Sequence, residues 1–522
     1  MPAALLSSSQ PGQASQAAGG LHRALGSIGH WSDRLLAERG IPVLDTSFVA
    51  VGGGLGSFAM VDYLRICGVP SSAIKVLTTL EHPWQNYQYL ASASQITLQG
   101  RLRSDSASTP DNIWGFPSYA FREAFAARSV RGFLAPLWTV LTEDILCDYW
   151  TPTAAQLFRG IQREADRIDY WPAVARGQVS LVHKRDGGGY FALFTPLGPG
   201  ATPVAYRSRF VHLAVGYPGL RLLEDLQRYR ELYTDHHRVV NAYEPHDHVY
   251  EELVSRGGTV VVRGGGIVAS RVLDRLITDR DAHASPITIL HVLRTWVRGP
   301  HGTSLFMRRR GGDGWAFQGF NWPKSTWGGH DKARLERLEG DERAQYLKAM
   351  GGTTTARRKR WMRQLARGRR EGFYRSYAGE IDDVRPGPFG SVVLRFTPEG
   401  DKGPIELAAS FVIDATGLQA EIDQHPVLAD LLAHGVAQRN PLGRLDMARS
   451  FELRGARSGP GRIYAAGAAT LGCYLAGVDT FLGLQYAALQ AADDLASLGY
   501  CDRIGVRRSM AQWVRWMGGR QP

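Results

Sequence analysis

The chain has 522 residues, of which 44% are hydrophobic and 21% charged, and its formal net charge at pH 7 is +12. This is the composition of a globular protein with about two to four domains. No apolar run is long enough to span a membrane and no signal-peptide pattern is present, so we expect a cytoplasmic protein. The four cysteines form no CxxC pair, which disfavours a dithiol redox centre or a cysteine zinc site, and we assign no metal ligands.

We expect residues 1–40 to be a flexible tail that ends in a short helix at His22–Gly40. The apolar run Phe48–Val51 then enters a glycine-rich turn, after which the apolar spacing is that of a helix. A strand, a glycine turn and a helix N-terminus together bind a dinucleotide pyrophosphate, because the backbone approaches the phosphates and free N–H groups point at them. Such turns also occur as plain structure. The candidate residues are Gly52, Gly53, Gly54, Gly56 and Ser57, the serine standing where the usual pattern has its third glycine.

A second strand is expected at Ile74–Leu80, followed directly by Glu81. An acid at this place accepts hydrogen bonds from the adenosine ribose of a dinucleotide; the alternative is a surface glutamate in a loop. His82–Ala120 has no clear period and is expected to be a long loop. Within it Arg103 is a candidate anion contact and Asn112 a candidate hydrogen-bonding residue, unless the loop is simply a packed one.

The middle of the chain alternates helical and strand patterns. Phe121–Ala175 is mostly helical in its spacing, Gln178–Phe194 is typical of a hairpin, and Arg209–Val215 is a strand that ends in a small-residue turn. Such a turn often returns the chain to a cofactor.

A second glycine turn follows the apolar run Val260–Val262. Its candidate cofactor-binding residues are Gly264, Gly266 and Ser270, with Ala269 as the alternative small packing residue. The next strand, Ile287–Val292, is closed by Arg294 and not by an acid. A positive charge here suits the 2′-phosphate of NADP, which favours NADPH over NADH unless Arg294 faces solvent.

Residues 297–384 mix aromatic and basic side chains and include a basic helix at Thr354–Gly372. Basic and aromatic residues together could bind nucleic acid. We favour an insertion with a solvated basic face, because the charges surround the helix, so a nucleic-acid partner is not expected.

The last third contains strands at Ser391–Phe396 and Ile405–Ile413, and the second of them runs into the turn Asp414–Gly417. A strand at Ile463–Ala466 enters Gly467 before a long helix, Thr480–Leu495, whose N-terminus could face a flavin. Candidate cofactor-binding residues here are Thr416, Gly417 and Gly467. We assign no function to the tail, residues 501–522.

Two glycine turns in one chain usually bind FAD at the first and a nicotinamide cofactor at the second. With the turn at Asp414–Gly417 they resemble the two-dinucleotide flavoproteins, and among these the flavin-containing and N-hydroxylating monooxygenases. A degenerate FxGxxxHxxxY fingerprint just before the second turn adds to the resemblance: His246 and Tyr250 match, whereas Val240 and Ala242 replace the Phe and the Gly. The resemblance covers Thr46 to about Leu498 and leaves out residues 297–384.

The resemblance implies an α/β fold with two Rossmann-like three-layer domains, the second inserted into the first. The FAD domain would take residues 41–235 and 385–500, and the NAD(P) domain residues 236–384 with its partly helical basic insertion. The implied reaction uses NADPH, FAD and molecular oxygen to form a flavin C4a-(hydro)peroxide, which oxygenates a small molecule. The candidate catalytic residues are Asn112 near the flavin, and His246 and Tyr250 at the hinge. Alternatives are an FAD-dependent NAD(P)H reductase without oxygen insertion, a nucleic-acid-binding flavoprotein, and a non-catalytic scaffold.

Overall fold

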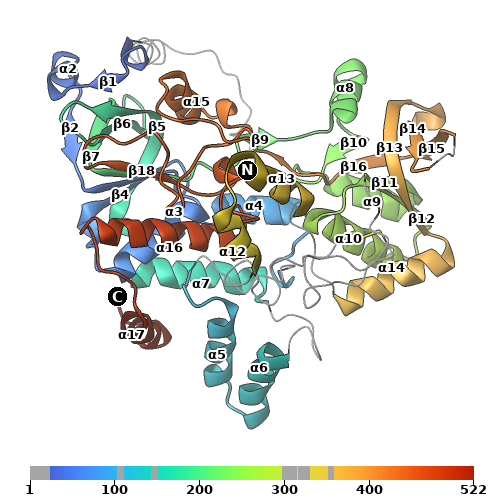
Figure 1. Cartoon of the computed structure of the whole chain (residues 1–522). Helices are drawn as coiled ribbons and strands as arrows, with labels where there is room; N and C mark the ends of the chain where they lie inside the picture. Colours follow the sequence, from blue (N-terminus) through green and yellow to red (C-terminus); the bar gives the residue numbers. More distant parts are fainter. Residues whose placement is uncertain are drawn as a thin grey trace.

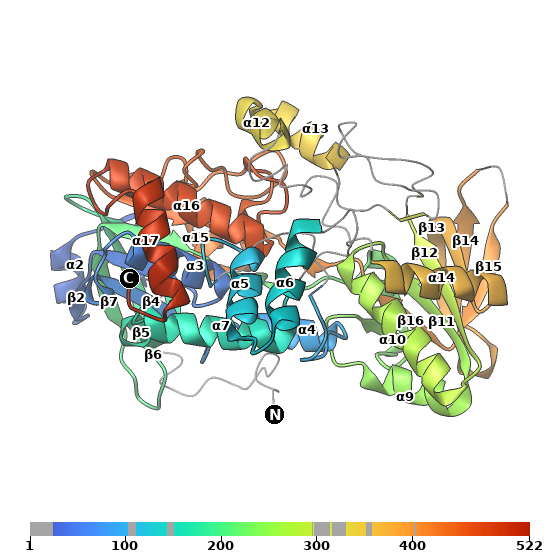
Figure 2. The same cartoon turned by 90° about the horizontal axis from the view of Figure 1, so that it is seen from below.

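The computed structural model describes residues 24–102, 111–142, 151–294, 296, 314–315, 330–350, 358–400 and 403–522. They form two α/β domains that lie side by side, each built on its own sheet (Figures 1 and 2). Both sheets have a parallel core to which antiparallel strands are added. The expected class, two Rossmann-like α/β domains, is confirmed.

In the part of the chain that the structure describes, the first sheet has nine strands, and its parallel core places β3 between β8 and β4. The hairpin expected at Gln178–Phe194 is present as β5 and β6, which pair antiparallel. In spatial order the strands are β18 (Arg462–Ala465), β8 (Phe210–Leu213), β3 (Phe48–Val51), β4 (Ile74–Thr78), β5 (Val174–Arg185), β6 (Tyr190–Pro196), β7 (Val204–Ser208) and β2 (Val43–Asp45), with β1 (His30–Trp31) on β5.

The described residues give the second sheet seven strands. In it β11 lies between β16 and β12, just as β3 lies between β8 and β4 in the first sheet. In spatial order they are β10 (Val239–Asn241), β16 (Phe411–Asp414), β11 (Gly258–Arg263), β12 (Ile287–Leu293), β13 (Tyr374–Pro386), β14 (Val392–Pro398) and β15 (Ile405–Ala409).

The boundary expected between residues 384 and 385 is wrong, because the chain does not return to the first sheet there. β14 and β15 extend the second sheet as an antiparallel edge, and β16 then runs parallel to β11 inside it. The single strand expected at Ile405–Ile413 is therefore two strands. The chain crosses between the domains at β9 (Gly219–Leu220) and β17 (Leu418–Gln419), which pair antiparallel as a ribbon (Figure 1).

Helices cover both sheets, and two of them correct a second expectation. The segment His82–Ala120 is not loop throughout, because α4 (Gln85–Ala93) forms in it and α5 begins at Phe116. The other helices are α2 (Asp33–Glu38), α3 (Leu55–Ile66), α5 (Phe116–Ala126), α6 (Val130–Thr142), α7 (Ala154–Arg167), α8 (Glu224–Tyr233), α9 (Asp247–Arg256), α10 (Ile267–His283), α12 (His330–Arg337), α13 (Gly340–Met350), α14 (Lys359–Glu371), α15 (Pro426–Ala433), α16 (Phe481–Ser497) and α17 (Val506–Met517).

The segment between β12 and β13 contributes to both domains. α14, the expected basic helix, buries a stripe of Trp361, Leu365 and Gly368, while Arg367 donates to Asp281 of α10 at 2.5 Å. α12 and α13 instead lie against the first domain, near α16 (Figures 1 and 2).

The C-terminal residues form α17, which packs against α5. Trp513 Nε1 donates to Ser118 Oγ at 3.2 Å, and Trp516 is fully buried. None of the helices that the structure describes is long and apolar enough to cross a membrane.

Candidate functional site

The first glycine turn lies where three parallel strands end. Gly52 N donates to Leu77 O of β4 at 2.9 Å, and Ala214 N, just after β8, donates to Val51 O at 3.0 Å. Gly52 has φ +91°, and a Cβ on it would lie 2.4 Å from Ala214 O. A side chain would thus have to displace the neighbouring backbone, so this turn requires glycine.

The N-terminus of α3 opens directly from this turn. Among the described residues no side chain caps its N-cap, Gly54, and a Cβ there would meet no heavy atom within 4 Å. The Ser57 hydroxyl in the first turn is buried and has no hydrogen-bond partner among the described residues. Gly56 packs closely, since its Cβ would lie 3.1 Å from that of Ala214. Gly467, two residues after β18, lies at the same edge of the sheet. Uncapped N–H groups, open space and an unsatisfied hydroxyl fit a pyrophosphate.

The second glycine turn repeats this arrangement. Gly264 N donates to Val292 O at 3.2 Å, and Ala415 N donates to Arg263 O at 2.8 Å. Gly264 has φ +129°, and its Cβ would lie 2.5 Å from Ala415 O. Gly266 is the N-cap of α10 and again has no side-chain cap. A second pyrophosphate-sized anion therefore fits here for the same reasons.

The turn at Asp414–Gly417 follows β16 and so belongs to the second glycine turn, not to the first domain as expected. The Asp414 carboxylate is buried, which raises its pKa. Its Oδ1 accepts from Thr416 N at 3.0 Å and from the Thr416 hydroxyl at 2.6 Å, and its Oδ2 accepts from Leu223 N at 2.9 Å. The Ser270 hydroxyl is likewise engaged inside α10, where it donates to Ile267 O at 2.6 Å.

His291, on the strand beside the second glycine turn, was not predicted from the sequence as a functional residue. It is fully buried in β12, and burial lowers its pKa to about 4, so the ring is neutral at pH 7. Nε2 lies 2.6 Å from Gly264 O and Nδ1 2.9 Å from Tyr374 OH. A carbonyl can only accept, so Nε2–H donates to Gly264 and Nδ1 accepts from Tyr374. His291 thereby holds the second glycine turn. Arg294, directly after β12, is exposed.

Three predicted site residues come from the long segment after β4, and the structure places them differently. Glu81 is exposed, lies three residues beyond the last residue of β4, and pairs with Arg176 at 3.7 Å. Arg103 lies outside the described residues. Asn112 is fully buried, accepts from Trp114 N at 2.9 Å through Oδ1, and accepts from the side chain of Gln485 on α16 through its carbonyl.

His246 and Tyr250 lie together near the domain boundary, at the start of α9. His246 Nε2 is 3.0 Å from Tyr250 OH and its Nδ1 is 2.7 Å from Glu244 O, while burial lowers the pKa of His246. The guanidinium of Arg275, on α10, lies 5.0 Å from the centre of the Tyr250 ring. Its Nη1 also donates to the side chain of Gln95, two residues after α4, at 3.4 Å. Sequence reasoning missed Arg275, which links the pair to the first domain.

No family model and no curated protein matches this chain. Solved structures do match over both domains. The ornithine hydroxylase of Pseudomonas aeruginosa is 14% identical, with a TM-score of 0.55 over 86% of this chain and 100% of that one. The FAD-bound cadaverine monooxygenase of Erwinia amylovora is 14% identical, with a TM-score of 0.59 over 92% and 95%. The fold is that of the N-hydroxylating monooxygenases.

The N-hydroxylating monooxygenases also provide a fully liganded comparison. The ornithine N-hydroxylase of Kutzneria sp. 744, described with reduced FAD, NADP⁺ and L-ornithine, is 13% identical. Its TM-score is 0.57 over 87% of this chain and 99% of that one. At this identity the comparison establishes a shared architecture, while the chemistry has to be argued from the residues of this chain.

Proposed function

We propose that the protein is an FAD-dependent, NADPH-using monooxygenase that transfers one oxygen atom of molecular oxygen to a small molecule. One observation carries the proposal: a single chain has two glycine turns of the same geometry, each at the edge where parallel strands end, on the fold of amine-hydroxylating enzymes. In open α/β sheets this edge is where dinucleotides bind. A monooxygenase of this kind needs one dinucleotide to deliver electrons and a second to react with oxygen.

The first turn is the proposed FAD site. The backbone of Gly52, Gly53, Gly54 and Gly56 and the unpartnered Ser57 hydroxyl would bind the pyrophosphate at the start of α3. Gly467, at the same edge of the sheet, would face the flavin half of the FAD molecule. Bound FAD supplies the redox and oxygen chemistry, and the protein orients it and excludes water. Contacts of Glu81 with the ribose and of Arg103 with an anion stay predictions.

The second turn is the proposed NADPH site. The backbone of Gly264 and Gly266 would bind the pyrophosphate, with His291 holding the turn in shape. Arg294 is exposed immediately after β12, where the 2′-phosphate of NADPH would meet it. Thr416 and Gly417 border this turn, and we propose that they contact the nicotinamide cofactor. Contact of Ser270 with the cofactor also stays a prediction.

The substrate is proposed to be a small primary amine, because the structural neighbours act on ornithine and cadaverine. Asn112, tied to α16, is the proposed hydrogen-bonding residue beside the flavin, and His246 with Tyr250 would set the position of the second domain. No strongly nucleophilic side chain is required, since the cofactor carries the reaction. The location of the protein in the cytoplasm, where NADPH is supplied, stays a prediction.

The test starts with purified protein reconstituted with FAD. Anaerobic NADPH should bleach the flavin faster than NADH, and admitting air should give a long-lived absorbance distinct from both oxidised and reduced flavin. Steady-state NADPH oxidation with a panel of diamines and basic amino acids should then yield a hydroxylamine with one of them. Immediate return to oxidised flavin, with stoichiometric hydrogen peroxide and no hydroxylated product from any amine, would contradict oxygen insertion. It would identify a plain reductase instead.

A further inference from the structure

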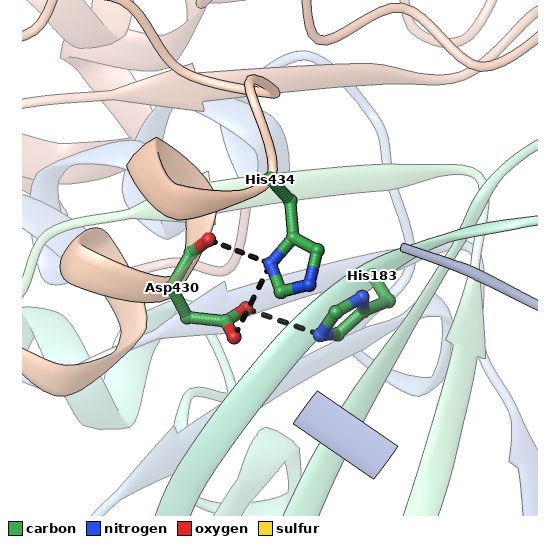
Figure 3. Close-up of side chains that lie close together, drawn as sticks. All are labelled: His183, Asp430 and His434. Atoms are coloured by element: carbon green, nitrogen blue, oxygen red, sulfur yellow. Dashed lines mark hydrogen bonds and ion pairs between the residues drawn. The ribbon is translucent and has the colours of Figure 1, made fainter. Parts of the chain in front are cut away.

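Two histidines and an aspartate meet in the first domain, away from both glycine turns. His183 comes from β5, whereas Asp430 and His434 come from α15 and its C-cap (Figure 3). One nitrogen of each imidazole and one carboxylate oxygen all lie within 4.8 Å of one another. The His183 side chain is 1% exposed, that of Asp430 14% and that of His434 19%. Solvent is therefore excluded from the cluster on the side of β5 but can reach it on the side of α15.

The hydrogen bonds of the two rings determine where their protons lie. His183 Nδ1 is 3.3 Å from Gly29 O, and His434 Nδ1 is 2.9 Å from the backbone carbonyl of Asp430. A carbonyl oxygen can only accept, so in each neutral ring Nδ1 carries the proton and Nε2 keeps a lone pair. This arrangement is the usual one for metal-binding histidines, whose second nitrogen donates to a carbonyl or carboxylate.

The lone pair of His183 faces a second electron-rich atom. Its Nε2 lies 3.1 Å from Asp430 Oδ2, yet the two are not aligned as a hydrogen bond, and neither has a hydrogen-bond partner among the described residues. A buried acceptor facing a carboxylate is unfavourable unless a cation joins them. A metal ion does not need the alignment that a hydrogen bond needs. In a tetrahedral site the angle that two ligand atoms make at the metal is far below 180°, so the ion lies to one side of the line that joins them.

We propose that His183, Asp430 and His434 form a binding site for a divalent transition metal ion, Zn²⁺ before others. Two imidazoles and one carboxylate suit Zn²⁺, which binds such atoms at about 2.0–2.2 Å. Three protein ligands leave a fourth position for water, which reaches the site past His434. His434 is the C-cap of α15 and the most exposed ligand, so its ring can close the remaining distance.

The role of the ion is structural. His183 stacks on Trp31 of β1, with ring centres 4.5 Å apart, and bonds Gly29, while the other two ligands lie on α15. The metal therefore joins the chain before α2, the hairpin strand β5 and helix α15. Sequence reasoning assigned no metal ligand, since His183 is remote in sequence from the other two and only the fold brings them together. This site is independent of the proposed oxygenase activity.

The test uses the full chain without a polyhistidine tag, treated with a chelator. Added ZnSO₄ should bind at one equivalent by isothermal titration and by elemental analysis after dialysis, and should raise the melting temperature. Asp430→Asn, which removes the charge at constant shape, should weaken Zn²⁺ binding by about two orders of magnitude or more. His236→Ala, a change at an exposed loop histidine, should bind like wild type.

Cobalt gives a readout that does not depend on variants. Co²⁺ at the site should give visible d–d bands of nitrogen and oxygen ligation without a thiolate charge-transfer band, and Zn²⁺ should abolish them. A wild-type protein that binds no more Zn²⁺ than Asp430→Asn, or a cobalt spectrum no different from Co²⁺ in buffer, overturns the proposal. The cluster would then be a contact between His183 and Asp430 without a bound metal ion.

Discussion

At the scale of single residues, Gly52 and Gly264 serve the same purpose in different domains, so replacing each should remove a different cofactor. Gly52→Ala places a Cβ 2.4 Å from Ala214 O, and Gly264→Ala places one 2.5 Å from Ala415 O, both at positive φ. Each change costs about 1–3 kcal/mol of local strain. We expect Gly52→Ala to purify with little FAD. Gly264→Ala should retain FAD but show at least a tenfold loss in flavin reduction by NADPH, measured by stopped flow.

Gly499→Ala is the control for these two variants, because it changes a glycine that has a positive φ but no close contact with neighbouring backbone. Gly499 has φ +73°, but a Cβ there would meet no heavy atom of the described residues within 4 Å. This variant should bind FAD and be reduced by NADPH like wild type. If Gly264→Ala also purified without FAD, the two turns would not be independent sites and the division of cofactors between domains would be wrong.

At the scale of elements, α12 and α13 hold the loop that follows Gly467. Arg343 of α13 is 2% exposed; its Nε donates to Gly472 O at 3.1 Å and its guanidinium lies 3.9 Å from the centre of the Tyr474 ring. Arg343→Met leaves the Gly472 carbonyl without this donor, which costs about 1–3 kcal/mol. We expect faster hydrogen exchange in residues 468–486 and weaker FAD retention, measured by mass spectrometry and flavin fluorescence.

Lys348→Met is the matched control, since Lys348 is exposed on the same helix. It loses the same charge at an exposed position, and it should exchange like wild type. Unchanged exchange in Arg343→Met would mean that α12 and α13 do not support this loop.

Sequence periodicity predicts many of these elements because each is a local pattern. Phe48–Val51 and the hairpin at Gln178–Phe194 form where expected, and the i, i+4 spacing of His246 and Tyr250 puts them within hydrogen-bonding distance on α9. The domain boundary could not be predicted, because nothing in the local sequence of β14, β15 and β16 indicates which of the two sheets these strands join. The cluster at His183 was missed for the same reason.

At the scale of the whole molecule, buried neutral histidines make the fold sensitive to acid. His212 in β8 and His291 in β12 are both buried, and burial lowers their pKa values to about 3 and about 4. The unfolded chain takes up these protons near pH 6.5, whereas the folded chain does not until much lower pH. The free energy of unfolding therefore falls as the pH drops below 6.5, and the loss continues down to the folded pKa values.

His212→Leu isolates one of these contributions, because His212 Nδ1 has no hydrogen-bond partner among the described residues. At pH 4.5 its proton uptake on unfolding destabilises the wild type by about 2–3 kcal/mol. Urea unfolding with excess FAD should give a variant that gains that much relative to wild type between pH 7 and pH 4.5. Buried carboxyls with raised pKa values, such as Asp414, act in the opposite direction, but they are common to both proteins and cancel in the difference. Parallel pH profiles for the two proteins would show that the His212 ring is already protonated in the folded state or solvated there.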